Sequence, residues 1–266
     1  HTKSMAAGYG LSEHAVLLGL DGLSIRSLHH AIDLGMAPNL EWLRRHSAFT
    51  DDARCVQPSV SLPNWASVLF GTTPSFHGVH LGKALDDAVR PATFADGTTW
   101  PNVFASARVQ RPQLSTAAFY SWPPLGHLLQ PADALNASVL MACGNCDECL
   151  AVEPKLAAAF IAALPRERYA LSWLYIDLLD ECGHARGDSH PSYVGLVRKV
   201  DRIVGDLLRA LREARMLDKT ALLVMSDHGR EVRYGKGHGG FTTGEMAVQW
   251  LLHAPGVPAG RLTWPV

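Results

Sequence analysis

The chain has 266 residues, a length that suits one sizeable domain with a deep core. Its residues are 47% hydrophobic and 18% charged, as in globular proteins, and the formal net charge of -1 argues against a nucleic-acid-binding surface or a polybasic membrane patch. No apolar run is long enough to span a bilayer.

Continuous apolar runs predict buried parallel strands, and amphipathic segments between them predict helices. In chain order we expect a strand at residues 15–20, helices at 24–34 and 38–46, a short helix around 65–69 and another near 101–109. Strands are then expected at 114–120, 169–176, 221–225 and 247–253, and helices at 153–164 and 191–216. This alternation indicates an α/β fold with a mainly parallel sheet sandwiched between helices. We expect residues 1–266 to form a single domain with an irregular, Cys-containing insertion at about 121–150.

Three of the five cysteines lie in the motif CGNCDEC, as Cys143, Cys146 and Cys149. This spacing could hold a metal ion as thiolates or form local disulfides. A structural zinc site usually needs a fourth ligand and none lies beside the motif, which favours a structural or redox loop. With Cys55 and Cys182 the count is odd, which is compatible with two disulfides and one free thiol.

Turns that carry carboxylates and imidazoles follow three of the predicted strands, and one more histidine lies in the glycine-rich GKGHGG. These residues are Asp21, Asp180, His184, Asp227, His228 and His238. In an open parallel sheet the carboxyl ends of the strands share one edge, so we expect these side chains to converge. Mixed Asp and His ligands suit zinc or a similar divalent ion, and six are enough for two ions. Asp177 is interpreted as a helix cap or ion-pair partner outside this set.

Ser61 is expected just ahead of the first turn of the short helix that ends at Gly71. A helix N-terminus offers unpaired N–H groups and partial positive charge, which suit a phosphate or an activated serine alkoxide. The structural alternative is that Ser61 only caps the helix. Beside two metal ions, the hydroxyl could instead be activated for an in-line displacement at phosphorus.

Taken in order, these motifs resemble the alkaline phosphatase superfamily, and most closely its type I phosphodiesterase and nucleotide pyrophosphatase group. The resemblance runs from about residue 15 to 260 and includes SLPN followed by GTTPSFHGV, DECGH, SDHG and HGG. It implies an alkaline-phosphatase-like fold with two divalent ions, zinc in the first place and manganese or another ion as alternatives. One ion would be held by Asp180, His184 and His238, and the other by Asp21, Asp227, His228 and the nucleophile Ser61.

The substrate contacts are the part of the pattern where the chain departs from that group. Members of the group often carry an Asn shortly after the HG-I/V motif, where Gly82 stands here, so His80 or Lys83 is expected to take its place beside Asn64. Many members also carry Thr where Ser61 stands, and Ser is the alkaline phosphatase choice. The nucleophile therefore does not decide between diester and monoester substrates.

The resemblance implies a metal-dependent hydrolase that cleaves phosphodiester or pyrophosphate bonds of a small phosphate ester through a phosphoserine intermediate. The alternatives are a phosphomonoesterase, a phosphotransferase and a non-catalytic metal-binding protein. A sulfatase is disfavoured because Trp65 stands at the Arg position of the C/S-x-P-x-R modification motif. The resemblance favours an extracellular or periplasmic location, although no signal peptide is visible after His1.

Overall fold

The computed structural model describes residues 12–80 and 91–262, which contain one eight-stranded sheet with the order β4-β3-β5-β1-β6-β7-β2-β8. The strands are β1 (His14–Leu20), β2 (Ala48–Arg54), β3 (Thr116–Tyr120), β4 (Ala137–Leu140), β5 (Leu171–Ile176), β6 (Thr220–Met225), β7 (Ala247–His253) and β8 (Gly260–Arg261). From β4 to β6 all neighbours are parallel, whereas β7 runs antiparallel to both β6 and β2. The predicted α/β fold with a mainly parallel sheet is confirmed.

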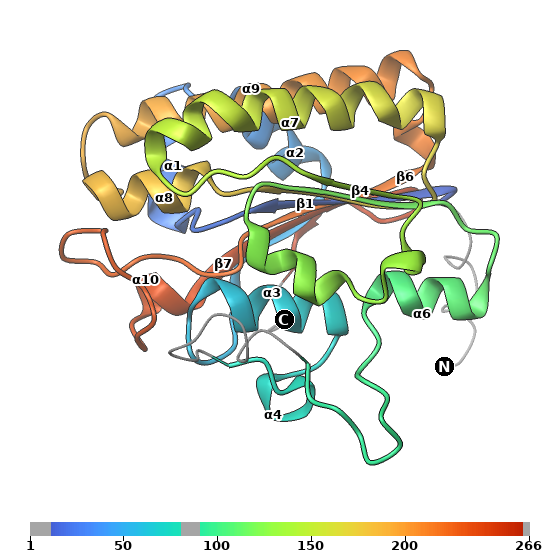
Figure 1. Cartoon of the computed structure of the whole chain (residues 1–266). Helices are drawn as coiled ribbons and strands as arrows, with labels where there is room; N and C mark the ends of the chain where they lie inside the picture. Colours follow the sequence, from blue (N-terminus) through green and yellow to red (C-terminus); the bar gives the residue numbers. More distant parts are fainter. Residues whose placement is uncertain (1–11, 81–90, 263–266) are drawn as a thin grey trace, which may run out of the picture.

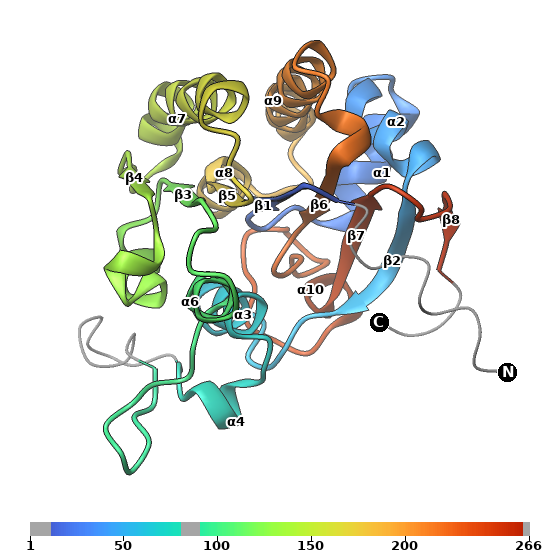
Figure 2. The ribbon, with the colours of Figure 1, turned by 90° about the vertical axis from the view of Figure 1, so that its right-hand side faces the viewer.

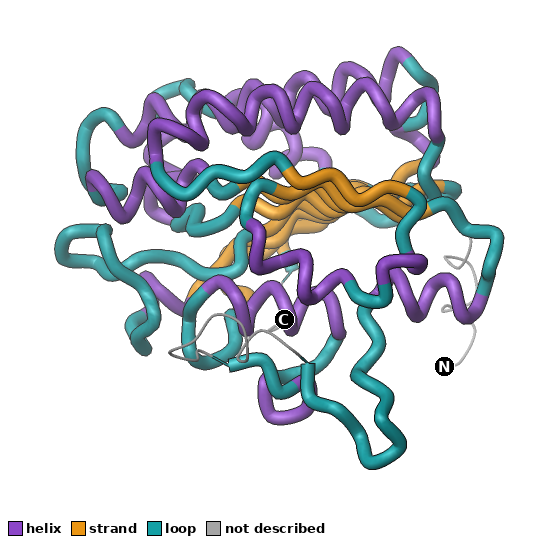
Figure 3. Tube along the Cα trace, viewed as in Figure 1, coloured by secondary structure: helices purple, strands orange, loops and turns teal. Residues whose placement is uncertain are grey.

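Helices cover both faces of this sheet, with α7 and α9 on one side and α3 and α6 on the other (Figures 1, 2 and 3). The helices are α1 (Ile25–Asp33), α2 (Pro38–His46), α3 (Ser61–Phe70), α4 (Pro74–His77), α6 (Val103–Gln110), α7 (Cys146–Glu167), α8 (Leu178–Arg186), α9 (Tyr193–Glu213) and α10 (Thr243–Met246), with 3-10 helices η1 (Pro123–Leu129), η2 (Ala132–Ala134) and η3 (Leu217–Lys219). Within residues 12–80 and 91–262, every helix is too short or too polar to span a bilayer.

The central strands are apolar on both faces because each face packs against a helical layer. In β5, Leu174 belongs to the core beneath α7 and α9, while its neighbours Trp173 and Tyr175 belong to the core around α3 and η1. The amphipathic helix α9 buries Val200, Val204 and other residues of one stripe against the sheet. These two cores hold the central strands β5, β1 and β6 in place, and the carboxyl ends of these three strands lie side by side at one edge of the sheet.

Several elements differ from the sequence prediction. The strand β2 was not expected because its sequence AFTDDAR contains two aspartates, a residue type depleted in strands. Its pairing with β7 and an ion pair between Asp51 and Arg44, 2.6 Å apart, overcome that preference. The segment 121–150, predicted to be irregular, contains η1, η2, β4 and the start of α7, and DECGH lies on the helix α8. The single-domain organisation stays a prediction.

A buried carboxylate of α9 caps the N-terminus of α2. The N-cap residue Ala37 has no side chain that could accept the free N–H groups of the first turn. Asp201 accepts these instead, with Oδ1 at 3.0 Å from the backbone N of Asn39 and 2.8 Å from that of Leu40. Its Oδ2 also accepts the Asn39 side-chain amide at 2.8 Å. The contact fixes α2 to α9.

We expect Asp201→Ala to lower the free energy of unfolding by about 2 kcal/mol, because it leaves buried N–H groups without an acceptor. Chemical denaturation measures this change. Asp206→Ala is the matched control, since Asp206 lies on the same helix in an exposed i,i+3 pair with Arg209 and should change stability by less than about 0.5 kcal/mol. Equal effects of the two substitutions would contradict the capping role.

Candidate active site

Ser61 lies at the start of α3, facing the edge where β1 and β6 end. It is the first residue of the helix, and the N-cap is Val60, so the alternative that Ser61 merely caps α3 is wrong. Its Oγ lies 3.3 Å from Asp21 Oδ1 and 3.1 Å from His228 Nε2. Because the hydroxyl is not used as a cap, it is free to face the acidic and imidazole groups at this edge.

All six carboxylate and imidazole residues predicted from the sequence come together here. One group of potential ligand atoms, all within 4.8 Å of one another, comes from Asp21, Asp227 and His228, and a second comes from Asp180, His228 and His238. His184 Nε2 completes the second group, at 3.0 Å from both Asp180 Oδ2 and His238 Nε2. The turns after β1, β5 and β6 therefore converge as expected for an open parallel sheet.

The orientation of the groups fits a divalent cation. His228 Nδ1 lies 3.0 Å from the Gly229 carbonyl, and His238 Nδ1 lies 3.0 Å from the Ser59 carbonyl. A carbonyl can only accept, so each Nδ1 carries the proton and each Nε2 offers its lone pair to the centre. Among the described residues, Asp227 Oδ2 is buried without a hydrogen-bond partner, which fits an atom that would coordinate a cation.

Two donors that sequence reasoning missed orient Asp21. Its Oδ2 accepts the indole N–H of Trp65 at 2.8 Å and the hydroxyl of Tyr175 at 2.6 Å, which leaves Oδ1 for Ser61. The two rings pack edge to face, 5.4 Å between centroids, and a Cβ at Gly19 of β1 would overlap the indole. The sequence held a sign of both contacts. Trp65 lies one helical turn after Ser61, and Tyr175 lies near the end of the neighbouring strand, where it pairs with Gly19.

Arg230 is a further residue that the sequence interpretation passed over, although it directly follows SDHG. Its fully buried guanidinium contacts Asp180 Oδ1 and also donates to the carbonyls of Asp180 at 2.5 Å and Lys236 at 3.0 Å. A Cβ at Gly183 would overlap this guanidinium, which explains the glycine in DECGH. Arg230 therefore supplies a buried positive charge directly beside the acidic cluster.

Asp177, interpreted as a helix cap or ion-pair partner outside the ligand set, lies beside that set in the structure. Asp177 occupies the N-cap position of α8, but its side chain makes no capping hydrogen bond. A carboxylate oxygen of Asp177 instead lies within 4.8 Å of oxygens of Asp21 and Asp180. Four buried aspartates therefore share this edge of the sheet.

Burial and mutual repulsion dominate the pKa values of these aspartates. Burial, with the charge of Asp180 adding to it, raises the pKa of Asp21 to about 6, against hydrogen bonds from Tyr175 and Trp65. Burial and the charge of Asp21 raise the pKa of Asp227 well above its ordinary value. Burial would raise the pKa of Asp180 too, but the charge of Arg230 and a hydrogen bond from His184 hold it well below its usual range.

The imidazoles respond to burial in the opposite sense. Desolvation lowers the pKa values of His228 and His238 to about 4, so both rings are neutral at pH 7. Their ligand lone pairs are therefore available without loss of a proton.

Three residues are expected to contact the substrate, Asn64, His80 and Lys83, and those of them within the described residues do not form a cluster as the carboxylate and imidazole residues do. Asn64 is buried, with Oδ1 accepting the backbone N–H of Val56 at 2.7 Å and Nδ2 donating to carbonyls of the 56–60 segment, including that of Val60 at 2.8 Å. Its amide holds the approach to α3, and its substrate contact stays a prediction. His80 is exposed, and Lys83 lies outside the described residues.

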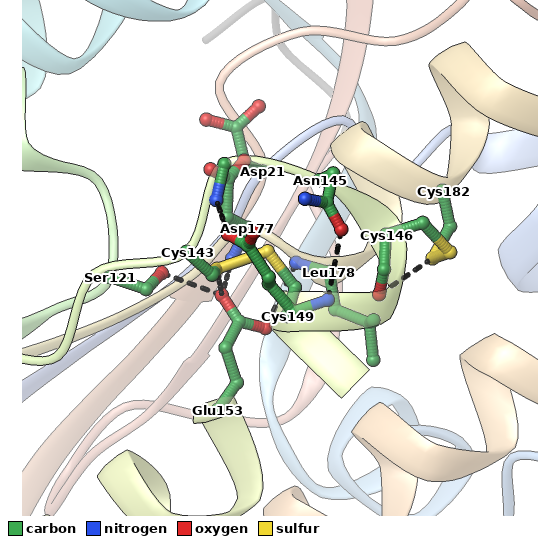
Figure 4. Close-up of a disulfide and its surroundings, with 12 residues drawn as sticks. Asp21, Ser121, Cys143, Asn145, Cys146, Cys149, Glu153, Asp177, Leu178 and Cys182 are labelled. Carbon is green, nitrogen blue, oxygen red and sulfur yellow. Dashed lines mark hydrogen bonds between the residues drawn. A yellow bond between two sulfur atoms is a disulfide. The ribbon is translucent and has the colours of Figure 1, made fainter. Parts of the chain in front are cut away.

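The cysteine motif forms disulfides, which excludes the alternative of a thiolate metal site. Cys143 pairs with Cys149 and Cys146 pairs with Cys182 (Figure 4). Cys55 is a buried free thiol. The odd count therefore resolves into two disulfides and one free thiol.

We expect the zinc affinity of the metal-free protein to rise as the pH increases from 5 to 7. A ligand carboxylate whose pKa is raised holds a proton at low pH, and zinc must displace it. The two buried histidines, with pKa values near 4, add little in this range. Competition with a chromogenic chelator at several pH values tests this, and an affinity independent of pH would contradict it.

Tyr175→Phe should destabilise the metal-free protein by about 1–2 kcal/mol, because a buried carboxylate oxygen loses a donor. The loss should also raise the pKa of Asp21 and so move the pH dependence of zinc binding to higher pH. Denaturation and zinc titrations measure the two effects. Tyr234→Phe is the control, since Tyr234 is 60% exposed, and a Tyr175→Phe protein that matched it would refute the orienting contact.

Comparison with known proteins connects this geometry to a family. The family model described as type I phosphodiesterase / nucleotide pyrophosphatase matches residues 15–232. Among curated relatives, ectonucleotide pyrophosphatase/phosphodiesterase family member 1 of Mus musculus is 23% identical over 236 residues, which cover 83% of this chain and 24% of the relative. GPI ethanolamine phosphate transferase 2 of Aspergillus fumigatus is 24% identical over 224 residues, which cover 80% of this chain and 26% of the relative. The chain thus spans about a quarter of the length of these two relatives.

Solved structures show the same fold. An inactive variant of murine ectonucleotide pyrophosphatase/phosphodiesterase 5 in complex with AMP superposes with a TM-score of 0.72 at 13% identity, covering 96% of this chain and 91% of that one. A 2-O GAG sulfatase superposes with a TM-score of 0.70 at 13% identity, covering 96% of this chain and 66% of that one. At this identity the likeness concerns the fold alone. The family model, however, matches well over half of the chain, so the chain belongs to the type I phosphodiesterase / nucleotide pyrophosphatase family of the alkaline phosphatase superfamily, as its motifs predict.

Proposed function

We propose that the protein is a two-metal phosphohydrolase that cleaves phosphodiester or pyrophosphate bonds through a phosphoserine intermediate at Ser61. The observation that carries this proposal is the position of the Ser61 hydroxyl. It lies at the N-terminus of α3, in contact with Asp21 Oδ1 and His228 Nε2 at 3.3 and 3.1 Å. A purely structural metal centre has no use for a hydroxyl in this place.

In this proposal one ion is held by Asp180, His184 and His238, and the other by Asp21, Asp227, His228 and the Ser61 hydroxyl. When bound, such ions lower the pKa of a serine hydroxyl and neutralise charge on the oxygens of the reacting phosphate. Carboxylate and imidazole donors favour zinc, with manganese or another divalent ion as the alternative. Two observations support a bound cation. Asp227 Oδ2 is buried without a hydrogen-bond partner, and the Nε2 atoms of His228 and His238 face the centre of the site.

The residues of the chain divide the reaction into two displacements. In the first, Ser61 Oγ gives up its proton and bonds to phosphorus, the bond from phosphorus to the leaving oxygen breaks, and the leaving group takes up the proton. In the second, water bonds to phosphorus, the bond to Oγ breaks, and the serine hydroxyl is restored. The free N–H groups and partial positive charge at the start of α3 favour the phosphate in both states.

A phosphotransferase of the same mechanism is the second candidate. It differs only in the second displacement, where an alcohol takes the place of water. The observation that favours it is the similarity to a relative named as a GPI ethanolamine phosphate transferase. A phosphomonoesterase also stays open, because the chain carries Ser where many relatives of the predicted group carry Thr.

The buried indole of Trp65 supports the preference for phosphate over sulfate esters. Its N–H donates to Asp21, so the position that a sulfatase modification motif gives to Arg here serves to orient a proposed metal ligand. An extracellular or periplasmic location forms part of the proposal. The names of several relatives as ectonucleotide enzymes support it, as do two disulfides, which persist in oxidising compartments.

We expect Ser61→Ala to lower the hydrolysis of a chromogenic phosphate diester by about 10³-fold or more, because no nucleophile remains. Rates on bis(p-nitrophenyl) phosphate and p-nitrophenyl phosphate, with zinc content measured in parallel, test this. Ser75→Ala, an exposed residue of α4, is the control and should retain the parent rates.

The faster of the two substrates assigns diester or monoester preference, and trapping of the product by an added alcohol reveals transfer. Unchanged turnover in Ser61→Ala would refute the phosphoserine mechanism. Zinc binding without turnover on either substrate would instead favour the non-catalytic alternative.

A further inference from the structure

The helix α8 carries two of the proposed metal ligands, Asp180 and His184, yet its N-terminus is not capped from within. The backbone N–H groups of Asp177 and Leu178 instead point toward a side chain of α7 (Figure 4). The N-cap residue Asp177 makes no capping hydrogen bond with its own side chain. Unpaired N–H groups at a buried helix start are costly, so another residue must accept them.

Glu153 of α7 is that acceptor. Its Oε1 accepts the N–H of Asp177 at 2.5 Å, and its Oε2 accepts the N–H of Leu178 at 2.9 Å. A third donor, the hydroxyl of Ser121, lies 2.6 Å from Oε1. The carboxylate is completely buried, and all three donors come from outside α7. Burial raises the pKa of Glu153 to about 7, against the hydrogen bonds from these donors. The donors connect the end of β3 and the start of α8 to this one side chain.

A disulfide holds α8 from the other side. Cys182 lies midway between Asp180 and His184, and it is bonded to Cys146, the first residue of α7. The Cys182 side chain is fully buried. The second disulfide, between Cys143 and Cys149, closes the start of α7 on itself. Of these two disulfides, only Cys146–Cys182 therefore connects α7 to α8, the helix that carries Asp180 and His184.

We propose that Glu153 and the Cys146–Cys182 disulfide position α8, and thereby set the affinity of the metal ion bound by Asp180, His184 and His238. This inference rests on the proposed function. A ligand set binds tightly only when its members are held in place before the ion arrives. His238 comes from a separate loop, anchored at the Ser59 carbonyl, so the two halves of the site meet correctly only if α8 is anchored too. Glu153 acts as a positioning residue, because its hydrogen bonds are with Ser121 and the start of α8 and not with the side chains of the proposed metal ligands.

The two disulfides provide a matched pair of variants. We expect Cys146→Ala with Cys182→Ala to weaken the binding of one zinc ion by about tenfold or more, while the other ion keeps its affinity. Cys143→Ala with Cys149→Ala removes a buried disulfide that does not reach α8, although Cys143 Sγ lies 3.9 Å from Glu153 Oε1, so it should weaken the same ion by clearly less. Chelator competition resolves the two ions, and thermal melting of the metal-free proteins reports the general loss of stability that both pairs share.

A second test leaves both disulfides intact. Glu153→Gln preserves the size of the side chain but replaces one acceptor oxygen by an N–H₂ group, which cannot accept. We expect the same zinc ion to lose affinity by roughly tenfold. Glu148→Gln is the control. Glu148 is an exposed residue of α7, and its side chain accepts the N–H of Gly144 at 2.9 Å, between Cys143 and Cys146.

The outcomes separate this inference from the proposed function. Two zinc ions bound by the parent chain, with one weakened selectively in both test variants, would support the positioning role. Equal affinities in test and control variants would overturn the inference and leave the proposed function standing. Failure of the parent chain to bind zinc at all would overturn both.

Discussion

Four buried aspartates repel one another at the carboxyl ends of β1, β5 and β6, and much of the surrounding structure compensates this repulsion. Asp21, Asp177 and Asp180 lie within one group of ligand atoms, and Asp227 joins Asp21 in another. Arg230 supplies a buried positive charge to Asp180, and Trp65 and Tyr175 supply hydrogen bonds to Asp21. The pKa values of Asp21 and Asp227 nevertheless stay raised by burial and by the neighbouring carboxylates. The proposed metal ions would add further positive charge at this edge.

Capping by residues far away in the chain positions two of the shorter helices. The helices α7 and α9 form the layer over one face of the sheet, and each lends a buried carboxylate to the N-terminus of a shorter helix. Asp201 of α9 caps α2, and Glu153 of α7 caps α8. Because both shorter helices begin where their own residues offer no side-chain cap, their positions depend on packing against the long helices rather than on local sequence. The helix α8, which carries Asp180 and His184, is further tied to α7 by the Cys146–Cys182 disulfide.

Ser61 occupies a position that combines two local effects. As the first residue of α3 it lies beside free N–H groups, and with Val60 as the N-cap its hydroxyl makes no capping bond. The buried amide of Asn64 ties the preceding segment to the helix through backbone hydrogen bonds. The nucleophile expected from the sequence is therefore held on a rigid element, directed at the carboxylates and imidazoles.

The sequence by itself determined the buried strands, the amphipathic helices and the chemistry of Asp21, Ser61 and the SDHG and DECGH motifs, because apolar periodicity and strand-end turns are local patterns. Tertiary structure alone decided the strand β2, the partner of Cys146, the guanidinium of Arg230 beside Asp180, and the carboxylate of Glu153 at the start of α8. Each of these joins residues far apart in the chain. Whether a buried charge or thiol meets a given partner depends on how the helical layers pack on the sheet. No pattern within a single segment encodes which distant residues come into contact.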